Sequence, residues 1–257
     1  MALGCALEDR FQRTGLSIFT IGLLFFMAGV ISYGCGAISS TPFPLIDHSL
    51  LHFDKLIHFN TLTAITWTHE HQHIHRVLRF AYDMWAFETV GIPILCAVIG
   101  DRDLLVRYIN AILIANIIGS LIYYFFPSCG PASILHSSYF PHEELIVYPA
   151  YVMIHKALPL HDMLVPLIAF PSFHVIHAVI FCCALKKYWP INKPEWRIPL
   201  IALFIINCLL IISTFMLGHH YIADVFGGFV VAILAWACVG WLCPTKNTPC
   251  LTHHPKT

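Results

Sequence analysis

Charged residues are scarce in this chain, and neither sign is in excess. Lysine and arginine number 14, aspartate and glutamate also number 14, and together they make up 11% of the 257 residues. Because the formal net charge is zero and no basic block stands out, we expect no nucleic-acid partner and no electrostatic docking to an acidic protein. Soluble domains carry about a quarter charged residues, so an ordinary soluble fold is excluded.

Apolar residues dominate instead, at 58% of the chain with a mean hydropathy of +0.74. A helix needs about 20 consecutive apolar residues to cross a bilayer. Six runs meet this length: Leu16–Ile38, Phe80–Gly100, Val106–Phe126, Val165–Leu185, Ile198–Leu217 and Tyr221–Cys243. The sequence therefore predicts an all-α fold, a polytopic membrane helical bundle with six transmembrane helices.

No repeat, low-complexity stretch or soluble linker divides the chain. We therefore expect a single integral membrane domain over residues 1–257, with a core of motifs at about residues 80–243. The first apolar run lacks a small-residue cleavage site after it, so we expect it to remain as a span rather than be removed as a signal peptide.

Lysine and arginine placement predicts the orientation, since cytoplasmic loops are enriched in both. With a cytoplasmic N-terminus, the inside set has ten members: Arg10, Arg13, Arg102, Arg107, Lys186, Lys187, Lys193, Arg197, Lys246 and Lys256. The outside set has four: Lys55, Arg76, Arg79 and Lys156. Both termini are thus predicted to be cytoplasmic, and the long loop at 127–164 extracytoplasmic, in a bacterial inner membrane or a eukaryotic endomembrane.

The ten cysteines do not indicate a disulfide framework. Five of them fall inside apolar runs, where a thiol behaves as a small hydrophobic group: Cys96, Cys182, Cys183, Cys208 and Cys238. Only Cys35 and Cys129 both fall near the expected outer face, and spacing alone does not establish a bond between them.

Two histidine-bearing elements stand at the expected outer boundary. The stretch GHHYIADVFGG places His220 and Asp224 four residues apart, a spacing that puts both on one face of a helix. The carboxylate can then accept from one imidazole nitrogen and leave the other free to attack. The second element, PSFH, ends in His174 at the start of the fourth run. Two histidines, one backed by an acid, can pass a phosphoryl group through a covalent intermediate.

Other polar residues compete for a role. Glu88 lies deep in the second run, and an ionisable group there indicates either a polar cavity near the reaction centre or a pairing with a neighbouring span. The stretch HEHQHIH offers two pairs at helical spacing, His69 with His73 and His71 with His75, that could chelate a transition metal. Because no cysteine and a single carboxylate accompany them, a solvated loop is favoured and no metal site is predicted.

Two motifs, Ser213-x6-His220-x3-Asp224 and Pro-Ser172-x-His174, resemble those of the type 2 phosphatidic acid phosphatase superfamily of six-span lipid phosphatases and phosphotransferases. The resemblance implies that His220 is the nucleophile, that Asp224 fixes its tautomer and stabilises its developing charge, and that His174 acts as acid and then base. It implies that Ser172 donates to a phosphoryl oxygen, and it requires neither metal nor other cofactor.

The chain departs from the hydrolytic members, which carry Lys-x6-Arg-Pro in the first motif and an arginine after the serine of the third. Here Gly130 precedes Pro131, and Thr214 follows Ser213. Such arginine-poor sites are more similar to the branch containing inositol phosphorylceramide synthase and sphingomyelin synthase. Those enzymes move a phospho-alcohol head group between lipids, and a diester monoanion needs less positive charge than a monoester dianion.

We therefore expect an enzyme that takes a lipid substrate from the bilayer, with Ser172, Ser213, His219 and Glu88 as candidate substrate-binding residues. A phosphatase of phosphatidic acid or prenyl diphosphate is the alternative, if Lys156 or the His-rich loops supply positive charge. A non-enzymatic, His-rich metal-binding membrane protein is the alternative from another class. His177 is expected to be packed or hydrogen-bonded, and Gly227 and Gly228 to permit close helix approach.

Overall fold

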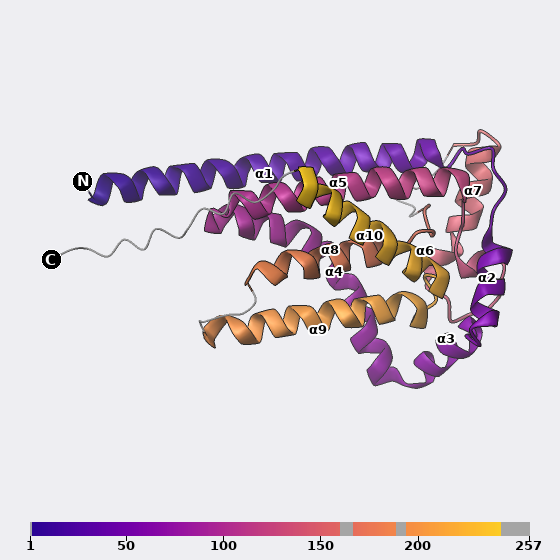
Figure 1. Cartoon of the computed structure of the whole chain (residues 1–257). Helices are drawn as coiled ribbons and strands as arrows, with labels where there is room; N and C mark the ends of the chain where they lie inside the picture. Colours follow the sequence, from indigo (N-terminus) through magenta and orange to yellow (C-terminus); the bar gives the residue numbers. More distant parts are fainter. Residues whose placement is uncertain (1, 160–166, 189–193, 243–257) are drawn as a thin grey trace.

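The computed structural model describes residues 2–159, 167–188 and 194–242, and every regular element in these ranges is helical (Figure 1). Five of its helices are long and apolar enough to cross a membrane: α1 (Ala2–Ile38), α4 (Gln72–Ile99), α5 (Arg102–Phe125), α9 (Pro194–Met216) and α10 (Ile222–Leu242). A shorter apolar helix, α8 (Phe173–Leu185), lies among them. The chain is therefore a multi-pass integral membrane protein built as an all-α bundle, as the sequence predicts.

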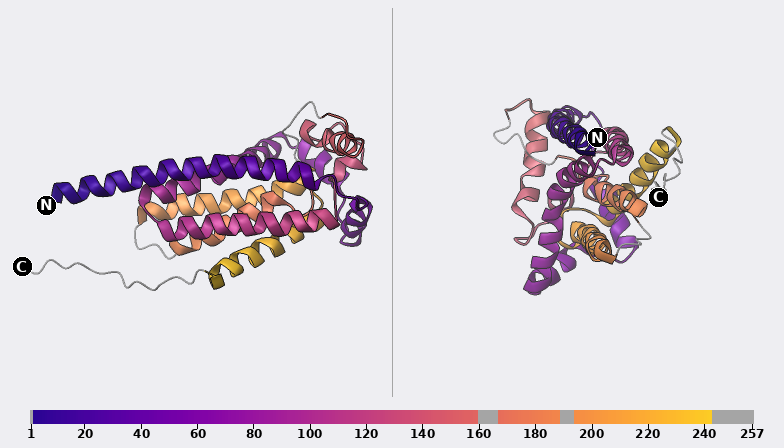
Figure 2. Two further views of the ribbon diagram at one scale, coloured as in Figure 1. Left: turned by 90° about the horizontal axis from the view of Figure 1, so that it is seen from above. Right: turned by 90° about the vertical axis from the view of Figure 1, so that its left-hand side faces the viewer.

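These six helices alternate in direction along the bundle (Figures 1 and 2). The short elements gather at one end, where α1, α5 and α9 finish and where α8 and α10 begin. They are α2 (Asp47–Leu56), α3 (Thr61–Glu70), the 3-10 turn η1 (Pro131–Ser133), α6 (His142–Leu145) and α7 (Val147–His155). The second 3-10 turn, η2 (Lys186–Tyr188), directly follows α8. The starts of α8 and α10, which carry the two motifs, therefore lie at the same end.

The fourth span differs from the prediction of a helix over Val165–Leu185. Residues 167–172 are not helical, and α8 begins only at Phe173, with Ser172 as its N-cap accepting from the backbone N–H of Val175 at 3.4 Å. Pro171 precedes the cap, so its missing N–H and its fixed φ lie outside the helix. At 13 residues, α8 is about 20 Å long and shorter than the roughly 30 Å hydrocarbon core. Its first turn therefore begins within the bundle.

Small residues let α8 and α10 approach closely. A Cβ added to Gly228 would lie 2.8 Å from the carbonyl oxygen of Ser172, and one added to Gly227 would lie 2.9 Å from the ring of Phe170. The backbone N–H of Ser172 donates to the carbonyl of Asp224 at 3.1 Å. The prediction that both glycines permit close approach is confirmed, and the contact joins the two motif-bearing turns.

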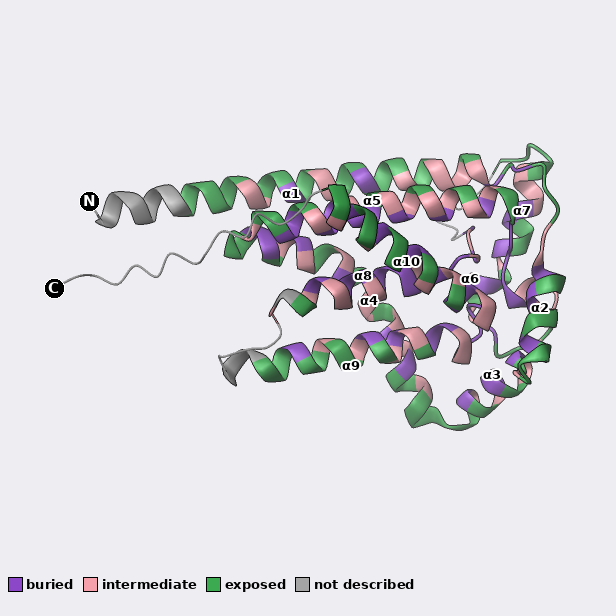
Figure 3. Ribbon diagram, in the orientation of Figure 1, coloured by how far each residue is buried: buried purple, intermediate pink, exposed green. Residues whose placement is uncertain are grey.

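The core lies between α4, α5, α8 and α10. Exposed residues run along the outer faces of the spans (Figure 3), and many of them are large and apolar. Phe25 on α1, Phe87 on α4 and Trp241 on α10 are exposed examples. In a bilayer such side chains face lipid, so their exposure is consistent with membrane insertion. Cys35 and Cys129 both carry free thiols, so no disulfide joins them.

Candidate active site at the starts of α8 and α10

His220 and Asp224 meet as the sequence predicts, but not along one face of a helix. His220 lies in the connection before α10, which begins at Ile222. Its Nδ1 is 3.3 Å from Oδ2 of Asp224, and the same oxygen accepts from the backbone N–H of Tyr221 at 2.9 Å. The correction has a local cause, because an acid at the third helical position folds back to satisfy the free N–H groups at a helix start.

The turn that carries His220 is held from several directions. Gly218 takes a left-handed conformation, with φ of 85°, that favours glycine, and the backbone N–H of His220 donates to the carbonyl of Thr214 at 2.9 Å. Asp54 of α2 accepts from the backbone N–H of Ile222 at 3.1 Å, so a residue 168 positions away satisfies the first turn of α10. These contacts orient the imidazole of His220.

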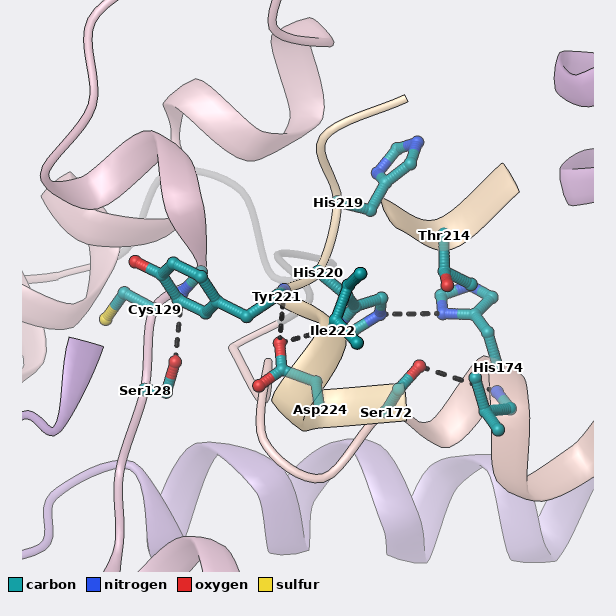
Figure 4. Close-up of polar contacts among 12 residues, drawn as sticks. Ser128, Cys129, Ser172, His174, Thr214, His219, His220, Tyr221, Ile222 and Asp224 are labelled. Atoms are coloured by element: carbon teal, nitrogen blue, oxygen red, sulfur yellow. Dashed lines mark hydrogen bonds and ion pairs between the residues drawn. The ribbon is translucent and has the colours of Figure 1, made fainter. Parts of the chain in front are cut away.

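The first turn of α8 brings His174 to His220. Nε2 of His220 lies 3.4 Å from Nδ1 of His174, and the two rings meet edge to face with centroids 5.6 Å apart (Figure 4). A nitrogen pair at this distance shares one hydrogen. If His220 donates Nδ1–H toward Asp224, its Nε2 carries the lone pair and His174 is the donor. The same Nε2 lone pair is the one that an incoming phosphorus atom would meet.

Burial keeps His220 neutral. Loss of solvation is the largest influence and lowers its pKa to about 4, against the charge of Glu144 and a hydrogen bond to the backbone of Ala169. A neutral imidazole with an acid at Nδ1 is the nucleophilic form.

Two aromatic side chains of α4 wall the site. The ring of Tyr82 stacks on both His174 and His219, with centroid distances of 4.4 and 3.9 Å. Trp85 contacts the ring of His174 at 4.7 Å and donates from Nε1 to Nδ1 of His177 at 2.6 Å. His177 is thus hydrogen-bonded, as predicted, whereas Tyr82 and Trp85 were missed. Aromatic residues in an apolar run carry no signal that separates a site wall from a core position.

His219 is buried beside a second acid. Its Nδ1 lies 2.8 Å from Oε1 of Glu144 on α6, and both side chains are buried. Glu144 was missed from the sequence because it stands in the long loop at 127–164, 75 residues from its partner. The one indication in the sequence was that Glu144 is an acid in a connection at the same end of the bundle as the two motifs.

Among the described residues, the guanidinium of Arg79 is a cation close to this site. Arg79 of α4 stands 5.9 Å from the centre of the Tyr82 ring, and acids hold it on two sides, Glu143 at 2.6 Å and Asp83 at 3.1 Å. The sequence placed Arg79 in an outer connection but assigned it no role. At Gly130 and Thr214, the positions compared with family arginines, the side chains supply no charge.

The two remaining predicted site residues have other partners. Ser213 is fully buried and donates to the carbonyl of Leu210 at 2.6 Å, within its own helix. Glu88 accepts from Asn207 of α9 at 3.2 Å, which is the interhelical pairing that the sequence left open beside a cavity role. Neither side chain is joined to His174 or His220 by these contacts.

The His-rich stretch is not one continuous helix, so it does not offer its four histidines at uninterrupted helical spacing. The helix breaks at His71, between α3 and α4, so helical spacing does not continue from His69 to His75. His69 instead stacks on Tyr139 at 4.2 Å and meets the ring of His75 at 5.7 Å. Across the described ranges, no group of three or more His, Cys, Asp or Glu side chains could hold a metal ion.

Comparison with known families matches this architecture. The family model described as the PAP2 superfamily matches residues 48–238, which include both histidine elements, the helices α4, α5, α8 and α9, and most of α10. The chain belongs to the PAP2 superfamily. No curated protein and no solved structure matches it. Membership supports a phosphatase-type function on lipid phosphates for this PAP2 superfamily member, and its site geometry bears on the reaction in more detail.

Proposed function

We propose that this PAP2 superfamily member transfers a phosphoryl or phospho-head group of a membrane lipid through a phosphohistidine at His220. The observation that carries the proposal is the juxtaposition of two imidazoles, Nε2 of His220 against Nδ1 of His174 at 3.4 Å, with Asp224 at Nδ1 of His220. One nitrogen is thereby available to attack, and a second imidazole is available to move a proton.

In the first step, the lipid phosphate enters between the two imidazoles and breaks the hydrogen bond that joins them. Nε2 of His220 forms a bond to phosphorus while the bond from phosphorus to the leaving oxygen breaks. His174, which enters this step as the imidazolium, gives that oxygen a proton and becomes neutral. Asp224 stabilises the positive charge that develops on the ring of His220. Ser172 donates to a phosphoryl oxygen in the resemblance, and here its hydroxyl also caps α8.

In the second step, His174 acts in the opposite direction. It takes the proton of water or of a lipid alcohol while the acceptor oxygen forms its bond to phosphorus and the bond to Nε2 breaks. The residues that carry these two steps are His220, His174 and Asp224 as catalytic groups, with Ser172, Ser213, His219 and Glu88 as the substrate-binding set expected from the sequence.

The charge around the site favours a diester over a monoester dianion. Thr214 and Gly130 are uncharged, and the nearby Arg79 is already held by Glu143 and Asp83. A phosphodiester carries one negative charge, so its binding is weakened less than that of a dianion when cations are few. Head-group transfer from one lipid to another, as in the inositol phosphorylceramide synthase and sphingomyelin synthase branch, is therefore the finer form of the proposal.

We place the site at the extracytoplasmic face. Ten against four lysine and arginine residues favour cytoplasmic termini, and the motif-bearing turns lie at the end of the bundle where α1 finishes (Figure 1). The lipid would enter sideways from the outer leaflet, between spans.

A second candidate is a phosphatase of phosphatidic acid or prenyl diphosphate. The observation that favours it is Arg79, whose guanidinium lies over the ring of Tyr82, which in turn stacks on His174. If Arg79 leaves its acids to bind a phosphate, it supplies the positive charge that a monoester dianion requires.

The deciding experiment uses protein purified in detergent and two labelled lipids, a diester phospholipid and phosphatidic acid, each with and without ceramide or diacylglycerol. A new labelled lipid that forms only with the acceptor supports transfer. Release of free phosphate from phosphatidic acid alone supports the phosphatase. Product formation that persists in His220→Ala contradicts the phosphohistidine mechanism for either reaction.

A further inference from the structure

A second acid–histidine pair lies beside the one that the proposed mechanism uses. Nδ1 of His219 is 2.8 Å from Oε1 of Glu144, and the exposed fractions of the two residues are 1% and 8%. Nε2 of His219 is buried and has no hydrogen-bond partner among the described residues. An unpaired buried donor costs free energy, so this nitrogen is a candidate for contact with a ligand.

The pair belongs to the wall of the same site. His219 immediately precedes His220 in the turn before α10, and Tyr82 stacks on the imidazoles of both His219 and His174 (Figure 4 for the histidines). A Cβ added to Gly130 would lie 3.3 Å from the carbonyl oxygen of His219 and 3.6 Å from Oε2 of Glu144. The pair thus abuts the uncharged position of the loop after α5.

The proton in the Glu144–His219 hydrogen bond decides what Nε2 of His219 can do. If the carboxyl keeps its proton and donates it to Nδ1, the neutral ring must carry its own hydrogen on Nε2. If the carboxyl is ionised, Nδ1 carries the hydrogen and Nε2 of the neutral ring becomes an acceptor. The first form attracts a phosphoryl oxygen, and the second repels it.

We propose that Glu144 is a positioning residue that holds His219 in the tautomer whose Nε2–H donates to a phosphoryl oxygen of the lipid substrate. The inference rests on the proposed transfer at His220 and deepens it. No proton is transferred in this role, since the N–H only donates. A neutral donor suits a diester monoanion, which is the substrate class that the sparse charge of the site favours.

Burial supports the neutral form of the pair. It is the largest influence on both groups, raising the pKa of Glu144 to about 8 and lowering that of His219 to about 3. The charged and titratable groups that face the pair come from α4, α6, α8, α10 and the turn before α10: Tyr82, Arg79, Asp83, Glu143, His174, His220 and Asp224. The charge of Arg79 favours an ionised Glu144, and that of Glu143 opposes it. Above about pH 8 the donor is therefore lost.

The kinetic test compares pH profiles of kcat/KM for the wild type, Glu144→Gln and His219→Phe on a labelled diester phospholipid. The wild type should lose activity as pH rises through about 8. Glu144→Gln retains an amide donor for Nδ1, so its activity at pH 7 should fall by less than about threefold and its alkaline decline should vanish. His219→Phe keeps the stack on Tyr82 but lacks the N–H, and should lose about 100-fold.

A spectroscopic test is independent of turnover. The infrared difference spectrum of wild type minus Glu144→Gln should show a protonated carboxyl band at pH 6 that disappears by pH 9.5. Absence of this band at pH 6 overturns the inference even if the enzyme is active. An inactive wild type that shows the band contradicts the proposed function and leaves the tautomer assignment supported.

The two kinetic outcomes that overturn the inference are also distinct. An unchanged alkaline decline in Glu144→Gln means that another group controls the profile. Wild-type activity in His219→Phe means that Nε2 does not contact the substrate. Thermal melting of each variant at pH 7 is measured alongside, so that a loss of fold is recognised separately.

Discussion

Nε2 of His220 and Nδ1 of His174 lie 3.4 Å apart although 46 positions separate the two residues. The contact exists because α8 and α10 begin at the same end of the bundle and touch through Gly228 and the backbone of Ser172. The imidazole of His220 has an acid at its other nitrogen, and no acid of the described ranges is hydrogen-bonded to the imidazole of His174. This asymmetry assigns the nucleophile to His220 and the proton transfer to His174 in the proposed reaction.

Replacement of His220 by alanine should reduce turnover by at least about 10³-fold, because the proposed covalent intermediate forms on its Nε2. Acid-quenched wild-type protein incubated with labelled lipid should carry label on histidine, and the variant should carry none. His48→Ala, an exposed histidine on α2, is the matched control. Undiminished turnover in His220→Ala would sink the mechanism.

Asp224 has two tasks that different substitutions separate. Asp224→Asn keeps an oxygen for the N–H of Tyr221 but removes the charge, so kcat should fall by about 10²- to 10⁴-fold with little change in melting temperature. Asp224→Ala also loses the cap and should cost about 1 kcal/mol more in stability. Equal activity of Asp224→Asn and wild type would show that the carboxylate does not act on His220.

Arg79 separates the two candidate reactions. Arg79→Gln removes the guanidinium near Tyr82, and should lower hydrolysis of phosphatidic acid about tenfold or more if that cation binds a monoester dianion. Transfer from a diester should change by less than about threefold, since exposed ion pairs contribute little. The ratio of the two rates in Arg79→Gln and Arg79→Lys is the measurement. A diester reaction that collapses in both variants contradicts the low-charge site proposed here.

The His-rich stretch provides a test of the metal alternative. Replacing His69, His71, His73 and His75 together by alanine should leave turnover within about threefold, because no metal-holding group forms among the described residues. Incubation with a chelator should likewise leave the rate unchanged. Two results together would favour the metal-binding function. The fourfold variant would lose all turnover, and the wild type would lose turnover on chelation and regain it when zinc is added.

The titration of Asp54 should make the folding stability depend on pH. Burial raises its pKa to about 6, against the backbone N–H groups of Ile222 and Ala223 that favour its ionised form. Its pKa is thus higher folded than unfolded, so its contribution to stability decreases as pH rises from about 4 to 6. Asp54→Asn removes this term and keeps an acceptor for α10. The melting temperature of the variant minus that of the wild type should therefore increase over that range, and a constant difference would refute the assignment.

Local patterns in the sequence were sufficient for the architecture and for the two motifs. Apolar run length predicted the spans, and the fourth was too long because hydropathy does not register Ser172 as a cap after Pro171. The contact of His220 with Asp224 was predicted from spacing, yet it forms across a helix start rather than along a helix. Periodicity cannot distinguish these, since both place the groups four residues apart.

What the sequence alone determined was which groups are present: apolar spans, two histidines, an acid, and uncharged residues at Gly130 and Thr214. Only the tertiary structure determined which side chains surround these groups. Tyr82, Arg79 and Glu144 come from α4 and a distant loop, and nothing in their local sequence separates them from core or surface residues. Side-chain contacts between distant segments depend on how helices pack, and a buried imidazole acquires its chemistry from those neighbours rather than from its position in the chain.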